Sequence, residues 1–391
     1  MIQPKPEGQI PYPISEKELE RRWAAVGQVL KKRDLDILVV QNEGQDLGGY
    51  VRWLTDQAAG YPVTVIFPRN GEMTVVLSGD SQFPPKPRKG ISSFICDGYF
   101  RTLRPTHDYD ARIITEVIKK AGARKVGLVN LGRMHACTYK YLTENLEGVT
   151  FEDITDDIDL IKAIKSPEEL KYIENTAKLH DTIMAAVPTM LRPGRMEYQV
   201  RNDLYYLSCE MGGEGQIVLL CGSAPKGQVI NYGPLAVQNR RIQYGDQFMV
   251  MLESSGPGGF FCEMSRYWSI GEPDEELVKG WEAALGTQRL IADLLRPGAD
   301  LREVFSEGNK YLVERGYYPE GRIFGHSQGY DLVERPGIQW DEVMPVAENM
   351  VFAVHPSAIN DKSNVFCCDN YIVTKDGSRR LEKMPQEIII L

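Results

Sequence analysis

The order of the predicted secondary-structure elements is the feature that most constrains how this 391-residue chain folds. Up to about residue 155, buried strand-like runs alternate with helical repeats, which is typical of an α/β layer domain. From residue 217 onward, strand-like runs come in blocks between long helices. The sequence therefore predicts an α+β protein, with a smaller α/β domain over 1–157 and a larger domain over 158–391.

Local signals predict individual elements. Ser166, followed by a proline and then by Glu169, is typical of a helix start, and it predicts a long helix that ends near residue 190. The apolar runs 63–67 and 73–77 are separated by turn residues and predict a β-hairpin. The glycine-rich segment 256–259 has no lysine and precedes a strand, so it predicts a hairpin turn rather than an anion-binding loop.

Composition excludes several classes of protein. The formal net charge is -9, from 45 Lys and Arg against 54 Asp and Glu, which argues against a nucleic-acid-binding protein. The longest apolar runs are far shorter than the roughly 20 residues of a membrane span, and the first residues contain no apolar leader. We therefore expect a cytoplasmic protein that binds neither membranes nor nucleic acids. The seven cysteines are irregularly spaced and are expected to be reduced.

Two of the five histidines are candidates for catalysis. His107, His135 and His180 lie in polar or helical surroundings, where a structural role is expected. His326 lies in a turn bracketed by glycines, and His355 ends an apolar strand just before a proline. Such positions bring a side chain to the edge of a folded sheet, where binding sites form.

The turn around His326 also matches the G-x-S-x-G pattern of serine hydrolases, with Ser327 as the nucleophile. That pattern requires a helix directly after the turn, and Pro336 with Gly337 prevents one here. The sequence contains neither G-x-G-x-x-G nor G-x-x-x-x-G-K-(S/T), so it offers no dinucleotide-binding or P-loop motif. The serine hydrolase interpretation is therefore disfavoured.

From about residue 160 to 391 the chain resembles the creatinase, prolidase and aminopeptidase family, also called M24, whose fold is named the pita-bread fold. The resemblance rests on motifs that occur in the family's order and with nearly its spacing. These motifs are the linker at 164–169, Gly245 with Asp246, the strand 259–266, the Gly-His-x-x-Gly turn at 325–329 with Glu334 and Pro336, the strand 350–356, and the segment 368–377. The resemblance implies a smaller N-terminal domain of the kind through which such enzymes dimerise.

The resemblance also implies where a metal site would lie. Peptidases of this family hold two metal ions with two Asp, one His and two Glu, because paired cations require several anionic oxygens. The matching positions here are Leu252 or Glu253, then Glu263, His326, His355 and Cys368. Only His326 is unchanged, so we expect no metal cofactor. Two further family histidines fall at Asn231 and Val333, which argues against cleavage of Xaa-Pro peptides.

The metal-free members of the family, of which creatinase is the type, therefore provide the working hypothesis. The chain is predicted to be a metal-independent, creatinase-like hydrolase that cleaves a C–N bond of a small nitrogenous compound. His355 would transfer protons near neutral pH, Glu263 would orient it or bind a cationic group, and His326 would act as a second acid or oxyanion donor. The predicted substrate contacts in this domain are Asn231, Tyr232, Glu253, Arg266, Tyr330 and Cys368.

Three alternatives stay open at this point. Glu263, His326, His355 and Cys368 are a reasonable set of ligands for a single zinc ion, which would make the protein a mononuclear metal hydrolase or an Xaa-Pro-type metallopeptidase. Some family members are carbon–sulfur lyases that act on sulfonium or betaine osmolytes, for which aromatic side chains would supply cation–π contacts. The candidates for those contacts are Trp53, Tyr232, Phe260 and Tyr330. A non-catalytic protein that binds a small molecule is the third alternative.

The N-terminal domain contributes two further candidates. Residues 48–55 occupy the place of the family's Tyr-Leu-Thr-Gly segment, which in creatinase-like dimers reaches the neighbouring active site. Arg52 would bind a substrate carboxylate as a bidentate fork, and Trp53 would line the same site. The resemblance thus implies a homodimer, although an exposed loop arginine explains Arg52 equally well.

Overall fold

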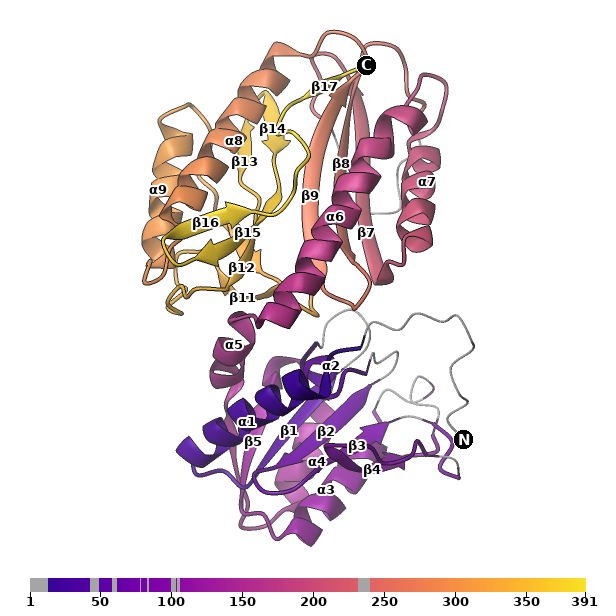
Figure 1. The fold of residues 1–391 in the computed structure, drawn as a ribbon, viewed down its shortest axis with the longest axis vertical. Coiled ribbons are helices and arrows are strands. Elements are labelled where there is room, and N and C mark those ends of the chain that lie inside the picture. The colour runs from indigo at the N-terminus through magenta and orange to yellow at the C-terminus, as the bar shows by residue number, and fades with distance from the viewer. Residues whose placement is uncertain are drawn as a thin grey trace. The chain divides into compact units, whose positions relative to one another are not determined.

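A computed structural model of the chain describes residues 13–42, 49–57, 62–77, 79–82, 84–99, 103, 106–230 and 240–391. The chain divides into two compact units, Met1–Ile161 and Lys162–Leu391 (Figure 1). The predicted boundary after residue 157 falls within helix α5 (Thr155–Ala163), which runs across the division. None of the helices in the described ranges is long and apolar enough to cross a membrane.

The N-terminal unit is built on one six-stranded sheet with the strand order β4-β3-β2-β1-β5-β6. Helices α3 and α4 pack on one face, where their apolar side chains join those of β1, β2, β3 and β5 in a common core. Strand β1 is buried along its whole length, and Figure 1 shows α1 and α2 on the opposite face. The elements are α1 (Glu16–Lys32), β1 (Ile37–Asn42), α2 (Gly49–Thr55), β2 (Val63–Pro68), β3 (Met73–Leu77), β4 (Ile91–Cys96), α3 (Tyr109–Ala121), β5 (Lys125–Val129), the 3-10 helix Leu131–Arg133, α4 (Ala136–Asn145) and β6 (Thr150–Asp153).

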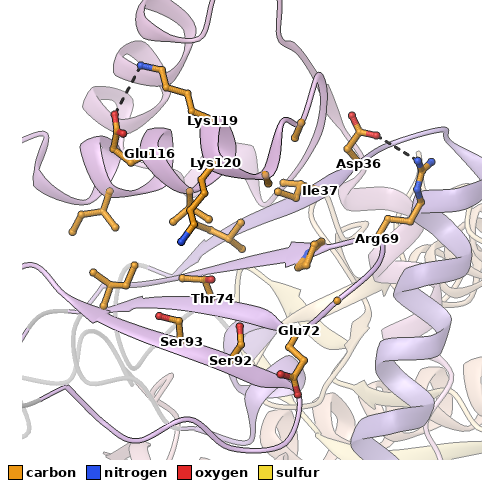
Figure 2. Close-up of a pocket in the computed structure, with 18 of the residues that line it drawn as sticks. Asp36, Ile37, Arg69, Glu72, Thr74, Ser92, Ser93, Glu116, Lys119 and Lys120 are labelled. Atoms are coloured by element: carbon orange, nitrogen blue, oxygen red, sulfur yellow. Dashed lines mark hydrogen bonds and ion pairs between the residues drawn. The ribbon is translucent and has the colours of Figure 1, made fainter.

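The N-terminal unit contains a cleft between α3 and strands β2 to β4, with a volume of about 1310 Å³ (Figure 2). Its charged side chains partly neutralise one another, since Lys119 pairs with Glu116 and Arg69 with Asp36. None of the titratable groups that line it is buried. Although this cleft is larger than the cavity described below, it lacks the buried acid–base groups on which catalysis depends.

The C-terminal unit combines helices with two main sheets, so the predicted α+β class is confirmed. One sheet has the order β17-β9-β8-β7 and the other the order β11-β10-β12-β15-β16, while β13 and β14 form a separate hairpin. Helices α6 and α7 pack on the first sheet, and α8 and α9 pack on the second (Figure 1). The elements are α6 (Pro167–Met190), α7 (Glu197–Glu210), β7 (Glu214–Pro225), β8 (Asp246–Ser255), β9 (Phe261–Ser269), α8 (Glu275–Leu294), α9 (Leu301–Val313), β10 (Gly325–Ser327), β11 (Glu334–Gly337), β12 (Val351–Val354), β13 (Ser357–Asn360), β14 (Ser363–Phe366), β15 (Asp369–Thr374), β16 (Gly377–Arg380) and β17 (Ile389–Ile390).

Several local predictions are confirmed. Ser166 caps α6 with a complete capping box, in which its hydroxyl accepts from Glu169 N and the Glu169 carboxylate accepts from Ser166 N. Strands β2 and β3 form the predicted antiparallel hairpin. All seven cysteines carry free thiols, as expected.

The glycine-rich segment 256–259 forms the predicted turn between β8 and β9. Gly258 and Gly259 have φ angles of +98° and +84°, which residues with a side chain rarely adopt. A Cβ atom at Gly258 would also lie 2.4 Å from the Tyr172 ring. The turn fixes the register of the hairpin, in which Glu253 lies directly opposite Glu263.

A buried ionic network fixes the segment that follows β10. The Glu334 carboxylate lies 3.3 Å from Lys162 Nζ and 2.8 Å from Lys165 Nζ, and it accepts from Asp331 N. Burial alone would raise the pKa of Glu334, but the two lysines lower it to about 2. The same carboxylate packs where a Cβ atom at Gly329 would lie, so it holds the backbone turn after His326 in place.

We predict that Glu334→Gln destabilises the C-terminal unit by about 3–5 kcal/mol at pH 7, because two buried lysines lose their counter-charge. The pKa of Glu334 is lower in the folded chain, so its contribution is complete well above the unfolded pKa near 4.5 and is lost as pH falls from there toward 2. Urea unfolding at pH 7 and at pH 4 measures both effects. The exposed Glu307→Gln is the control, and equal stability of Glu334→Gln and wild type at pH 7 would contradict the prediction.

Candidate active site

The β8–β9 hairpin brings two carboxylates to one face of its sheet. Side chains alternate along a strand, so Glu253 and Glu263, which are paired across the hairpin, point to the same side. Leu252 pairs with Met264, and both pack into the core beneath α6 and α7. Of the two residues considered for the first carboxylate position, Glu253 is therefore the one that faces the cavity.

The second main sheet supplies the two imidazoles. His326 lies on β10 opposite Ala353 of β12, and His355 follows the end of β12, where its backbone N–H donates to Phe324 O at 2.8 Å. The centroids of the two rings are 5.1 Å apart. His326 Nε2 lies 3.2 Å from Glu263 Oε1, and Nδ1 lies 3.0 Å from Ser327 O. A carboxylate and a backbone carbonyl therefore face the two ring nitrogens of His326.

Three further side chains position Glu263. Gln328 Nε2 donates to Glu263 Oε1 at 2.8 Å, and the Cys368 thiol donates to Oε2 at 3.8 Å. The Asn370 amide bonds to both backbone groups of Glu263, at 2.6 Å to the carbonyl and 3.3 Å from the N–H. Sequence reasoning missed Gln328 and Asn370 as functional residues, although Gln328 lies inside the Gly-His-x-x-Gly turn and Asn370 lies two residues after Cys368.

These groups border a cavity of about 410 Å³ in the C-terminal unit. Glu253, Glu263, His326 and His355 line it together with Arg322, an exposed residue that sequence reasoning also missed. The volume lies within the range of small-molecule sites. The other lining residues are Leu220, Met251, Ile323, Leu332, Val333, Ser357 and Phe366.

The electrostatics of the cavity divide these groups into charged and neutral members. Burial, and then the charge of Glu263, raise the pKa of Glu253 to about 8. Burial opposes the charge on Glu263 and on His326, but their contact lowers the pKa of Glu263 and raises that of His326. Burial, and then the positive charge of His326, lower the pKa of His355 to about 4. At neutral pH, Glu253 and His355 are therefore neutral beside an ion pair.

The donor atoms of Glu263, His326 and His355 also lie within 4.8 Å of one another, so these three residues could hold a metal ion. Cys368 is not part of this group, and burial followed by the charge of Glu263 raises the pKa of its thiol well above the ordinary value. Within the described ranges, the four-ligand zinc set suggested by the sequence is thus reduced to three ligands.

Arg266 does not bind substrate as predicted. On β9 it shares the side of Met264 and Trp268, not that of Glu263, because residues three apart on a strand face opposite ways. Its fully buried guanidinium contacts Asp369 at 2.6 Å and the carbonyls of Ser265, Cys368, Met384 and Pro385. It is a structural residue.

The aromatic candidates Trp53, Phe260 and Tyr330 pack in the protein interior. Tyr330 and Phe260 are buried with their ring centroids 4.2 Å apart, and neither lines the cavity. Trp53 is buried in the N-terminal unit, where the Arg22 guanidinium lies 5.3 Å from its ring. Tyr330 and Phe260 therefore do not supply the cation–π site that a sulfonium lyase would require, and the contribution of Trp53 to the site of a second copy stays a prediction.

The remaining candidates have different outcomes. Asn231 and Tyr232 lie outside the described residues. Arg52 lies on α2 of the N-terminal unit, and its contribution to the site of a second copy stays a prediction. His180 has the expected structural role, since it is buried and bonded to Ser254 Oγ at 2.9 Å. Ser327 is fully buried on β10, away from the exposed position that a serine nucleophile requires.

Comparison with known proteins agrees with this architecture. The family model described as "Metallopeptidase family M24" matches residues 171–375, which is more than half of the chain. The uncharacterized peptidase YqhT of Bacillus subtilis is 23% identical over 282 residues, covering 71% of this chain and 78% of that protein. The probable dipeptidase PepE of Mycobacterium tuberculosis is 26% identical over 240 residues, covering 61% of this chain and 63% of that protein.

A solved structure extends the likeness over nearly the whole length. The Xaa-Pro dipeptidase from Bacillus anthracis superposes with a TM-score of 0.77 at 19% identity, covering 95% of this chain and 100% of that one. At this identity the likeness concerns the fold, including the smaller N-terminal domain. The chain therefore belongs to metallopeptidase family M24 and is a hydrolase with the pita-bread fold of that family.

Proposed function

We propose that this protein hydrolyses a C–N bond of a small nitrogen-containing molecule by proton transfer among its own side chains, without a metal ion. The observation that carries this proposal is the convergence of Glu253, Glu263, His326 and His355 on one small cavity. Neighbouring titratable groups whose pKa values are driven apart are typical of acid–base catalysis, and the two carboxylates and the two imidazoles both have this property.

Each group suits one step of hydrolysis. His355 is neutral at pH 7, so it can accept a proton from the water that attacks the carbon atom. The His326 imidazolium, held by Glu263, can stabilise the negative charge that develops on the substrate. Glu253 keeps its proton near pH 7 and can donate it to the departing nitrogen as the C–N bond breaks. Return of the proton from His355 to Glu253 then completes the cycle.

The next question is whether these side chains could hold the pair of metal ions that peptidases of this family bind. Two adjacent cations need several anionic oxygens, and among the described residues that line the cavity only Glu253 and Glu263 are carboxylates. Glu263 Oε1 already accepts bonds from Gln328 and contacts His326. The donor set therefore does not fit a pair of ions.

A mononuclear metal hydrolase is the second candidate, because the donor set does fit one ion. Glu263, His326 and His355 would hold it, and two His with one Glu is a known catalytic zinc set. A bound ion would polarise a carbonyl group and lower the pKa of water. Gln328 and Cys368 would then orient Glu263 by hydrogen bonds, as outer residues do around metal ligands.

We predict that protein purified without added metal cleaves at least one member of a panel of small amides, amidines and N-acyl amino acids, and keeps its rate in EDTA. His355→Ala should lower that rate at least about 100-fold, since it removes the proposed base. Metal analysis by mass spectrometry accompanies each assay, and His135→Ala in the N-terminal unit is the control.

Two outcomes would reject the metal-free mechanism. Activity that is lost in EDTA and restored by one equivalent of zinc would support the mononuclear candidate. Cleavage of Xaa-Pro dipeptides that depends on manganese or cobalt would support a metallopeptidase.

We further predict that Glu253→Gln lowers kcat by about 100-fold or more while KM changes little, because glutamine keeps the shape of the side chain but cannot donate the proton. Steady-state kinetics with the best substrate of the panel measure both constants. The exposed Glu272→Gln is the matched control for the lost carboxyl group. A wild-type kcat in Glu253→Gln would exclude Glu253 as the acid.

A further inference from the structure

Arg322 lines the same cavity as the four proposed catalytic side chains but has no part in their proton transfers. It is exposed, and no described residue forms an ion pair or hydrogen bond with its guanidinium. A guanidinium offers five N–H donors in a planar fork that matches a carboxylate. The N–H donors of the Arg322 guanidinium are therefore available to a ligand in the cavity that the proposed catalytic groups line.

The backbone that carries Arg322 is fixed on both sides. Arg322 N donates to Glu320 Oε1 at 2.8 Å, and the backbone of Glu320 is bonded to the Asn309 amide at 2.6 and 3.2 Å. Two residues after Arg322, Phe324 N donates to Ile338 O at 3.0 Å. Because the chain is held before and after it, the guanidinium explores only the space that its own side chain reaches, which lowers the entropic cost of binding an anion.

No described residue that lines the cavity forms an ion pair with Arg322, although its charge acts on Glu253 and His355. Glu263 and His326 contact each other at 3.2 Å and form a pair. Apart from Ser357 and the remaining catalytic groups Glu253 and His355, the other described lining residues are apolar. Arg322 is the only arginine or lysine among the described lining residues, and a single guanidinium suits a singly charged carboxylate better than a phosphate dianion.

We propose that Arg322 determines specificity by binding the carboxylate of the substrate, which makes the substrate a small carboxylic acid with an apolar side group and a C–N bond elsewhere in the molecule. N-acyl and N-amidino derivatives of apolar amino acids have this chemistry. The C–N bond in this substrate class rests on the proposed function. The binding of a carboxylate by Arg322 does not depend on that function. Arg322 thus selects the substrate, and the Glu and His side chains act on it.

The test compares acids with their uncharged amides. N-acetylleucine, N-acetylphenylalanine and N-amidinoleucine are titrated by calorimetry against wild type and Arg322→Met, each beside its primary amide. Wild type should bind at least one acid about 10- to 100-fold more tightly than its amide, as expected for a charge-assisted pair. Arg322→Met should lose this preference, and Arg322→Lys should retain part of it because a point charge replaces the fork.

The exposed Arg192→Met is the matched control, since it removes the same charge outside the cavity and should keep the preference for the acid. Circular dichroism and thermal unfolding verify that each variant is folded. Equal binding of every acid and its amide by wild type, or an unchanged preference in Arg322→Met, would overturn the inference. Hydrolysis is measured separately, so a preference for acids without any turnover would reject the proposed function alone.

Discussion

The register of the β8–β9 hairpin is the constraint on which the site depends. It places the half-buried Glu253 directly across from the buried Glu263. Two carboxylates so close cannot both ionise at neutral pH, so one of them retains a proton. The contact with His326 determines which one, because it stabilises the charge on Glu263 and leaves Glu253 neutral. A single backbone register thereby creates an acid beside an ion pair.

The surroundings keep this arrangement rigid. Buried charges are stable only when their hydrogen-bonding capacity is met, and Glu263 meets it through Gln328, Cys368 and His326. On the far side of the same strand, the Arg266–Asp369 pair joins β9 to β15, so the two sheets that contribute the carboxylates and the imidazoles are bound together. Glu334 performs a similar task for the turn after His326. The ion pairs of Arg266 with Asp369 and of Glu334 with the two lysines thus support the site without lining its cavity.

Local patterns predicted much of this chain, and long-range contacts explain what they missed. The Ser166 cap and the β2–β3 hairpin depend on neighbouring residues, and so both were predictable. Motif order predicted the fold and brought Glu263, His326 and His355 together. Arg266 was misplaced because strand alternation was not applied to it. The sequence left Leu252 and Glu253 undecided, since only the pairing with β9 separates them. Gln328, Asn370 and Arg322 gain their roles from residues distant in sequence.

The change of donor set alters what the fold can do chemically. In the family's two-ion site, carboxylates neutralise cations, and the cations activate water. By the motif resemblance, the imidazole of His355 and the thiol of Cys368 stand where the family has two carboxylates, while His326 is unchanged. With fewer anions in the cavity, protein donors are enough to stabilise the charge of Glu263. Glu253 can then keep its proton. A cavity of this kind no longer repels anionic substrates as a cluster of carboxylates would, so an unpaired guanidinium at its edge can select for a negative charge.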